Sequence, residues 1–181
     1  MYAQGGGASS ATLINCLIVG NYAQAAYGTY GGGGAYNSTL SNCTVVGNSS
    51  YYGGGVHGGS VYNSIVYANS NYAGSHVDPN WYNATVFSNS CTTPSNVAGW
   101  AEGNITNNPM LIDFGSGYGT NHVVGNYRLS VGSPCINSGM NQDWMNNSVD
   151  RDGHKRIQYG TVDMGAYERI NEGTMIMFGG R

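Results

Sequence analysis

One nine-residue phrase occurs four times in the first half of the chain, and this repetition restricts the possible folds more than any other feature. The copies start about 20 to 27 residues apart, a period that indicates a solenoid of stacked coils. They read LINCLIVGN, LSNCTVVGN, VYNSIVYAN and WYNATVFSN, and they begin at Leu13, Leu40, Val61 and Trp81.

The residues inside each phrase favour strands over helices. Short β-branched pieces such as TLINCLIV and STLSNCTVV lie between glycine and asparagine turns, without the 3.6-residue spacing of a helix. Such strands fit a parallel β-helix, in which coils stack about 4.8 Å apart and like residues form columns. A leucine-rich horseshoe needs more leucines in each repeat, and an antiparallel sandwich does not need columns. We therefore expect an all-β parallel β-helix of about four to six coils.

Two asparagines are fixed in the phrase. Asparagine tolerates the left-handed backbone of a tight turn, and its amide can bond the asparagine of the next coil. We therefore predict two structural ladders rather than a catalytic set. One contains Asn15, Asn42, Asn63 and Asn83, and the other contains Asn21, Asn48, Asn69 and Asn89.

Charge is confined to the second half of the chain. All nine acidic and all six basic residues lie from Asp78 onward, and the formal net charge is -3. This balance indicates no nucleic-acid partner, and no apolar run approaches the ~20 residues of a membrane span. Catalysis on the coils is disfavoured, because polysaccharide lyases and hydrolases need carboxylates or a cationic base. Besides tyrosine and cysteine the coils offer only His57 and His76, which we expect to be exposed turn residues.

The change in composition also suggests how the chain is organised. We expect regular coils in residues 1–92, and irregular last coils with a C-terminal cap in residues 93–181 of the same domain. An open end of a β-helix is an unpaired edge that must be protected. The cap is therefore predicted to cover the end of the stack.

Three segments of the second half carry a family resemblance. GNITNNPMLID, YRLSVGSPCINSG and DRDGHKRIQYGTVDMGAYE resemble the C-terminal region of bacterial right-handed parallel β-helix proteins of the choice-of-anchor Q type. The GGGV and NCTVVGN phrases resemble the coils of that family and those of polymorphic outer-membrane adhesins. The resemblance implies a right-handed parallel β-helix, secreted or displayed at the cell surface, with a sorting anchor after GAYE. Here only RINEGTMIMFGGR follows Glu168, so we expect a C-terminal fragment or a short relative.

The DRDG run invites a calcium hypothesis. It begins like a calcium loop, although an EF-hand would need further ligands that the following residues do not supply. A looser calcium site would use Asp150, Asp152 and Asp163. The alternative is that Asp150 and Asp152 are turn residues with Lys155 and Arg156 as ion partners.

The four cysteines form two sets. Cys16 and Cys43 occupy one column of the repeat and should be stacked neighbours, either within disulfide range or reduced as small apolar residues. Cys91 and Cys135 lie outside the repeat. If the protein is secreted, a Cys91–Cys135 disulfide would tie the cap to the stack.

Tyrosine supplies the remaining functional signal. The connections between coils should lie on one edge of the solenoid, and tyrosines there could stack on sugar rings or contact a protein. They could equally be exposed side chains without a partner. The tyrosines concerned are Tyr22, Tyr27, Tyr30, Tyr51, Tyr52 and Tyr72.

These observations give three functional hypotheses. The first is a non-catalytic extracellular or cell-surface module, structural or adhesin-like, that binds a polysaccharide or surface glycan through the tyrosines. The second is a fibre subunit that self-associates through the open N-terminal coil. The third is a polysaccharide lyase or glycoside hydrolase that uses carboxylates of the second half.

Overall fold

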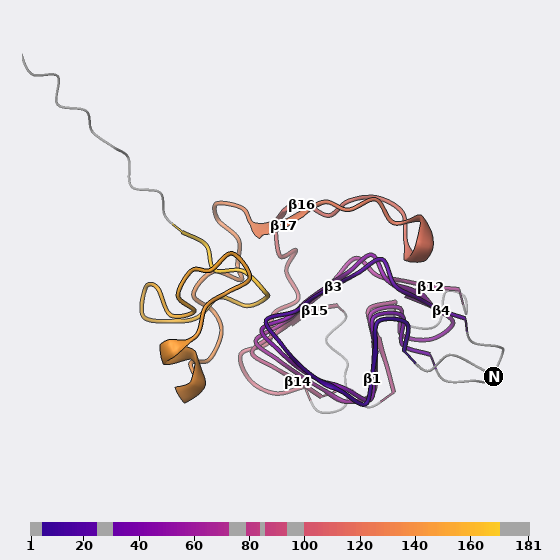
Figure 1. Ribbon diagram of the computed structural model, residues 1–181, viewed down its shortest axis with the longest axis horizontal. Helices are drawn as coiled ribbons and strands as arrows, with labels where there is room; N and C mark the ends of the chain where they lie inside the picture. The colour runs from indigo at the N-terminus through magenta and orange to yellow at the C-terminus, as the bar shows by residue number, and fades with distance from the viewer. Residues whose placement is uncertain (1–4, 25–30, 73–78, 84–85, 94–99, 171–181) are drawn as a thin grey trace, which may run out of the picture.

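The computed structural model describes residues 5–24, 31–72, 79–83, 86–93 and 100–170. Short strands repeat in four successive coils that lie over one another in Figure 1. The first coil contains β1 (Ala8–Ser9), β2 (Thr12–Ile14), β3 (Leu17–Val19) and β4 (Tyr22–Ala23). The second contains β5 (Ala35–Tyr36), β6 (Thr39–Ser41), β7 (Thr44–Val46) and β8 (Ser49–Ser50). The third contains β9 (Val56–His57), β10 (Ser60–Tyr62), β11 (Ile65–Val66) and β12 (Ser70–Asn71), and the fourth contains β13 (Trp81–Tyr82), β14 (Val86–Ser88) and β15 (Cys91–Thr92).

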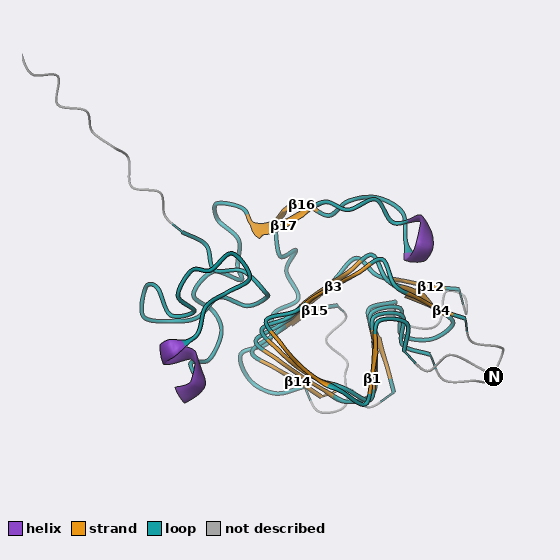
Figure 2. Ribbon diagram, in the orientation of Figure 1, coloured by secondary structure: helices purple, strands orange, loops and turns teal. Residues whose placement is uncertain are grey.

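Strands at equivalent positions of successive coils pair in parallel. They form four sheets, in the orders β1-β5-β9-β13, β2-β6-β10-β14, β3-β7-β11-β15 and β4-β8-β12. Each strand is two or three residues long and ends at a tight turn (Figure 2). The chain is therefore an all-β, parallel solenoid, as the period and the strand composition predicted.

The inside of the stack is filled by columns of apolar residues. Leu40 pairs with Val61, and Val61 pairs with Phe87, along the second sheet. Val45 and Val66 belong to the same core from the third sheet. All five are at most 1% exposed, and burial of each such side chain contributes about 1.5–3 kcal/mol.

The fourth coil is in a different register from the one that the repeat predicted. The sequence alignment placed Trp81 in the column of Val61, but the structure pairs Trp81 with Val56 and Phe87 with Val61. The alignment was wrong because it matched the similar segments VYN and WYN. The observed register buries the Phe87 ring completely in the column that Leu40 and Val61 begin.

This shift corrects the first asparagine ladder. Asn15, Asn42 and Asn63 adopt left-handed backbone at one corner of successive coils, with φ of 54°, 50° and 47°. Asn89, with φ of 47°, takes the fourth place. The backbone N–H of Asn63 donates to the carbonyl of Ser88, the residue before Asn89. Asn83 instead follows β13 at another corner.

The second ladder is also corrected at its fourth member. The Oδ1 atom of Asn48 accepts hydrogen bonds from the backbone and side-chain nitrogens of Asn21, at 2.9 Å each. Asn69 Oδ1 accepts equivalent bonds from Asn48, at 3.0 Å. The next acceptor is Asn80, at 3.1 and 3.2 Å from the two nitrogens of Asn69, and not Asn89. The ladder therefore continues through the residue before β13.

The C-terminal half lies along the side of the stack, not over its end as predicted (Figure 1). After a further partial coil, in which Trp100 bridges to Phe87 and Ile105 to Cys91, the chain turns back. It forms the antiparallel pair β16 (Leu111–Asp113) and β17 (Asn126–Leu129), and two 3-10 helices, η1 (Gly119–Asn121) and η2 (Asp143–Asn147). In the described part of the chain, no helix is long and apolar enough to cross a bilayer.

The first three corner asparagines explain this lateral position. We call Asn15, Asn42 and Asn63 the corner row. Their Nδ2 atoms donate to the carbonyls of Val149, Asp163 and Met140, at 3.0, 3.3 and 2.9 Å. Instead of bonding one another, as predicted, the side chains of the corner row bind the C-terminal segment. Each of three coils thus supplies an amide that holds this segment against the stack.

Candidate functional site: the tyrosine edge

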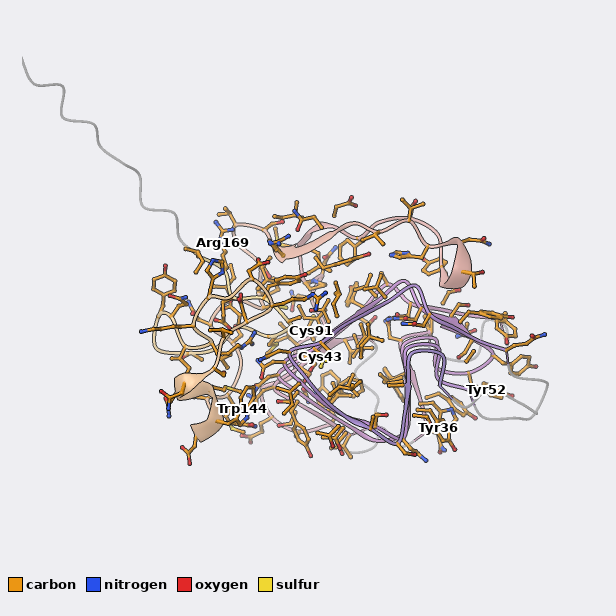
Figure 3. The ribbon with its side chains drawn as sticks, in the orientation of Figure 1. Tyr36, Cys43, Tyr52, Cys91, Trp144 and Arg169 are labelled. Atoms are coloured by element: carbon orange, nitrogen blue, oxygen red, sulfur yellow. The ribbon has the colours of Figure 1, made fainter. Side chains whose placement is uncertain are left out.

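Tyrosines gather on the side of the stack opposite η2, where Figure 3 labels Tyr36 and Tyr52. Side chains alternate across a strand, so the buried Ala35 and Val56 direct the next residue of each strand, Tyr36 and His57, outward. Tyr82 pairs with His57 and continues the same column.

Glycines allow the connection between coils to pass close to this column. A Cβ atom at Gly54 would collide with the backbone of Ser70 in the fourth sheet of the same coil. Only glycine fits such a close approach. The glycine runs therefore bring the start of a coil beside the end of the same coil, where Tyr51 and Tyr72 follow β8 and β12.

Among the residues that the structure describes, seven aromatic rings form one continuous series, which we call the tyrosine edge. Neighbouring ring centroids lie 4.6 to 5.9 Å apart, within the range of stabilising aromatic contacts. In order along the edge, the members are Tyr22, Tyr72, Tyr51, Tyr52, Tyr82, His57 and Tyr36.

The end of the tyrosine edge formed by Tyr22 and Tyr72 is exposed to solvent. Tyr22 and Tyr72, which stack with an interplanar angle of 30°, are 42% and 43% exposed. The hydroxyl of Tyr72 also donates to the carbonyl of Ala23, at 3.1 Å, and so fixes its ring across the coils. This end therefore presents ordered aromatic surface to solvent.

His57 lies inside the edge rather than in an exposed turn, which corrects the prediction. It is 1% exposed, its ring contacts Tyr36 and Tyr82, and its Nε2 atom lies 3.3 Å from Asn83 Nδ2. Burial lowers the pKa of His57, so the ring is neutral at pH 7 and the edge carries no charge.

Four of the six predicted tyrosines belong to this edge. They are Tyr22, Tyr51, Tyr52 and Tyr72, whereas Tyr27 and Tyr30 lie outside the described residues. The sequence reasoning missed Tyr36, Tyr82 and His57 because it considered the connections and not the strands. Strand alternation after Ala35 and Val56 would have identified two of the three.

The three aspartates of the calcium hypothesis do not form one group. Asp150 and Asp152 lie with His154, and their ligand atoms are within 4.8 Å of one another, but Asp163 is not part of this cluster. Asp150 Oδ1 accepts the amides of Asp152 and His154, at 2.8 Å each. Both oxygens of Asp152 accept from Arg128, at 2.6 Å.

The turn-and-ion-pair alternative describes these carboxylates, with a different partner. Arg128, and not Lys155 or Arg156, pairs with Asp152 and lowers its pKa. Asp163 accepts the backbone amides of Asn137 and Arg169, at 2.7 and 2.6 Å. The oxygens that a calcium ion would need are therefore already engaged with donors of the protein.

Arg156 is the centre of a buried charged cluster. Its guanidinium is 0% exposed and its Nη2 atom lies 3.0 Å from Glu168 Oε1. Asp150 and Asp163 are also buried nearby. Burial raises the pKa of Glu168 to about 8, and the negative charges of Asp163 and Asp150 add to this effect, against the attraction of Arg156.

Replacing Glu168 with glutamine should remove a pH dependence of stability. Because the pKa of Glu168 is about 8 in the folded protein, against an ordinary 4.5, the folded state keeps a proton that the unfolded chain releases between these values. Unfolding then releases a proton, so the free energy of unfolding falls as the pH rises through this window. Relative to Glu168→Gln, the wild type should lose roughly 2 kcal/mol between about pH 5.5 and 7.

Urea unfolding at several pH values measures this difference. Taking the variant as reference cancels the titration of groups that both proteins share. Parallel stability curves for the two proteins would show that Glu168 is ionised throughout, as the partner of Arg156.

A cavity of about 220 Å³ beside this cluster bears on the hydrolase hypothesis. Its lining includes Asp152 and Glu168, the pair of carboxyls that such an enzyme would need. However, the side chain of Glu168 is only 1% exposed, and Asp152 is held by Arg128. The cavity therefore offers no accessible pair of carboxyls for acid–base chemistry.

The structure brings the cysteines together in the two predicted pairs. The thiol of Cys43 lies close enough to Cys16 to lower its pKa, and the thiol of Cys135 lies close enough to Cys91 to raise its pKa. All four are present as free thiols. The Cys91–Cys135 disulfide stays a prediction, and both residues are buried in the same cluster.

Comparisons with known proteins add no assignment. No family model matches the chain, and no curated protein shows a significant sequence match. The resemblance to β-helix proteins of the choice-of-anchor Q type therefore stays a prediction.

Proposed function

We propose that the chain is a non-catalytic, right-handed parallel β-helix module of the cell surface or extracellular space that binds a neutral glycan. The observation that carries this proposal is the tyrosine edge, whose most exposed end is formed by the stacked rings of Tyr22 and Tyr72. The family resemblance supports the location and the handedness.

The chemistry of the edge favours a sugar chain. The C–H faces of a sugar ring stack on aromatic rings, and tyrosine hydroxyls can bond its hydroxyl groups. The edge continues over four coils in steps of about 4.8 Å, so it presents an elongated surface rather than a closed pocket. No Asp, Glu, Lys or Arg occurs in residues 1–77, which favours a neutral glycan over a uronate.

The double variant Tyr22→Ala/Tyr72→Ala should bind the glycan at least ~10-fold more weakly, because two stacking rings together contribute about 1.4 kcal/mol or more. Glycan-array screening identifies the polysaccharide, and affinity electrophoresis in that polysaccharide measures the loss. Tyr159→Ala is the matched control, since Tyr159 is 49% exposed but lies on the C-terminal segment. Thermal unfolding of each variant verifies that it folds.

Three other results would contradict the proposal. Equal retention of the double variant would exclude the edge as the binding surface. Release of new reducing ends or unsaturated uronates would show the enzyme hypothesis to be correct. A particle mass that grows with concentration and falls in Tyr22→Ala would favour self-association, because β1 to β4 have a hydrogen-bonded neighbour strand on one side only within the described residues.

A further inference from the structure

Cys16 and Cys43 face one another across two neighbouring coils. Ile14 pairs with Ser41 and Leu17 with Thr44, so Cys16 and Cys43 lie between these pairs in the same register. The amide of Thr44 donates to the carbonyl of Cys16, at 3.0 Å. Neighbouring strands are about 4.8 Å apart, which is within the Cα separation that a disulfide bridges.

The two thiols differ in exposure. Cys43 is 0% exposed, and its Sγ atom lies 3.3 Å from the carbonyl oxygen of Ser41 and 3.4 Å from that of Leu13. Cys16 is partly exposed. A reagent can therefore reach Cys16, with Cys43 directly behind it.

The electrostatics of the pair favour a thiolate on Cys16. The hydrogen bond from Cys43 lowers the pKa of Cys16 to about 6, and the positive charge of Arg151 acts in the same direction. The same bond and burial raise the pKa of Cys43. One proton is thus shared by a pair in which the accessible sulfur is the nucleophile.

The other cysteine pair lacks this difference in exposure. Cys91 and Cys135 are both 0% exposed, and the Cys135 thiol and burial raise the pKa of Cys91. Buried thiols in apolar surroundings are inert. The chain therefore contains an internal reference for the reactivity of Cys16 and Cys43.

We propose that Cys16 and Cys43 form a thiol–disulfide exchange site for low-molecular-weight disulfides. The Cys16 thiolate attacks one sulfur of the reagent, forming a mixed disulfide and expelling one thiolate. Cys43 then attacks the Cys16 sulfur, its proton passes to the second leaving thiolate, and the Cys16–Cys43 disulfide forms. Two protein thiols are oxidised and one disulfide is reduced to two thiols, so atoms and electrons balance.

The second step is possible because the first step removes the main cause of the raised pKa of Cys43. Once Cys16 is in a mixed disulfide, it no longer accepts the Cys43 hydrogen bond as an anion, and the main cause of the raised pKa of Cys43 disappears. The register holds Cys43 next to the sulfur that it attacks, and such proximity accelerates a reaction strongly. The resulting disulfide links the first coil to the second and closes the loop that carries Tyr22.

The test treats the reduced protein with oxidised glutathione and maps the products by peptide mass spectrometry. The wild type should form the Cys16–Cys43 disulfide without a lasting glutathione adduct. Cys43→Ser should accumulate glutathione on Cys16, and Cys16→Ser should give neither product. Alkylation should reach Cys16 at least ~10-fold faster than Cys91 or Cys135 in the folded protein.

Serine is a suitable replacement because the fold already uses it in this column. Ser64 Oγ accepts the amide of Cys43, at 2.9 Å, and Ser90 Oγ accepts the amide of Ser64, at 3.1 Å. Thermal unfolding verifies both variants, and Cys91→Ala is the control for the other pair. Preferential oxidation of Cys91 and Cys135, equal alkylation of all four cysteines, or a lasting adduct on Cys16 in the wild type would each overturn the proposal.

Discussion

Replacing Arg156 with leucine should lower the free energy of unfolding by about 3–5 kcal/mol, the usual cost of breaking a buried ion pair on one side. The substitution leaves the buried carboxyl of Glu168 without its guanidinium, next to Asp163 and Asp150. It also removes the bonds from Arg156 Nη2 to the carbonyls of Asp163 and Gly165, at 3.2 and 3.1 Å. Urea unfolding at pH 9, where Glu168, with its pKa of about 8, is ionised, followed by circular dichroism, measures the change.

Two further variants separate the pair from a general effect of leucine. Lys155→Leu changes the adjacent, exposed residue, and such surface changes usually stay within about 0.5 kcal/mol. The double variant Arg156→Leu/Glu168→Leu should recover part of the lost stability, because the carboxyl of Glu168 is no longer left without its partner. If Arg156→Leu and Lys155→Leu are equally stable, the buried cluster does not hold the C-terminal segment in its fold.

Replacing Asn48 with alanine should cost about 3 kcal/mol or more, since each buried polar group left without a partner costs ~1–3 kcal/mol. Asn48 is 0% exposed. Its Nδ2 atom donates to the carbonyls of Ile18 and Val46, at 2.8 and 3.1 Å, and its Oδ1 atom accepts both nitrogens of Asn21. Alanine satisfies none of these groups, so the first coil should loosen from the second.

The matched control for this substitution is Asn146→Ala. Asn146 is exposed in η2, so its replacement should change stability by less than ~0.5 kcal/mol. Guanidinium unfolding of the two variants and the wild type gives the comparison. A similar, small loss in both variants would mean that water replaces the ladder, and that apolar packing alone sets the spacing of the coils.

The stacked coils could be predicted because their signal is local and repeated. A strand of two or three residues followed by an asparagine turn is encoded by the phrase itself, and the structure holds Asn15, Asn42 and Asn63 in the left-handed turns that were expected. The predicted register of the fourth coil was wrong, because similarity of residue types does not show which side chain fills the core. Phe87 fits the core column that Val61 continues, whereas the alignment had assigned that column to Trp81.

The position of the C-terminal segment could not be read from any local pattern. Its contacts join residues far apart in the chain, such as Asn63 with Met140, 77 positions later. Each such bond depends on the turn that directs the asparagine outward and on the irregular path of the other partner. The same reason applies to Arg156, which the sequence assigned to neighbouring aspartates and which the structure pairs with Glu168.

The tyrosine edge could be predicted from the sequence only in part. Tyr22, Tyr51 and Tyr72 follow from the rule that connections align on one edge of a solenoid. Tyr36 and His57 required knowledge of which strand residues point outward. That information was present in the sequence, where Ala35 and Val56, which the structure buries, directly precede them.

The corner row has a consequence for how this protein can evolve. Repeat proteins commonly gain or lose units by duplication and deletion, since each unit contacts only its neighbours. Here three successive coils are bonded to carbonyls of the C-terminal segment, which lies beside them. An inserted coil would displace the later amides by about 4.8 Å from their carbonyls. The C-terminal segment therefore fixes the number of coils, and a change in that number requires a rearrangement of this segment.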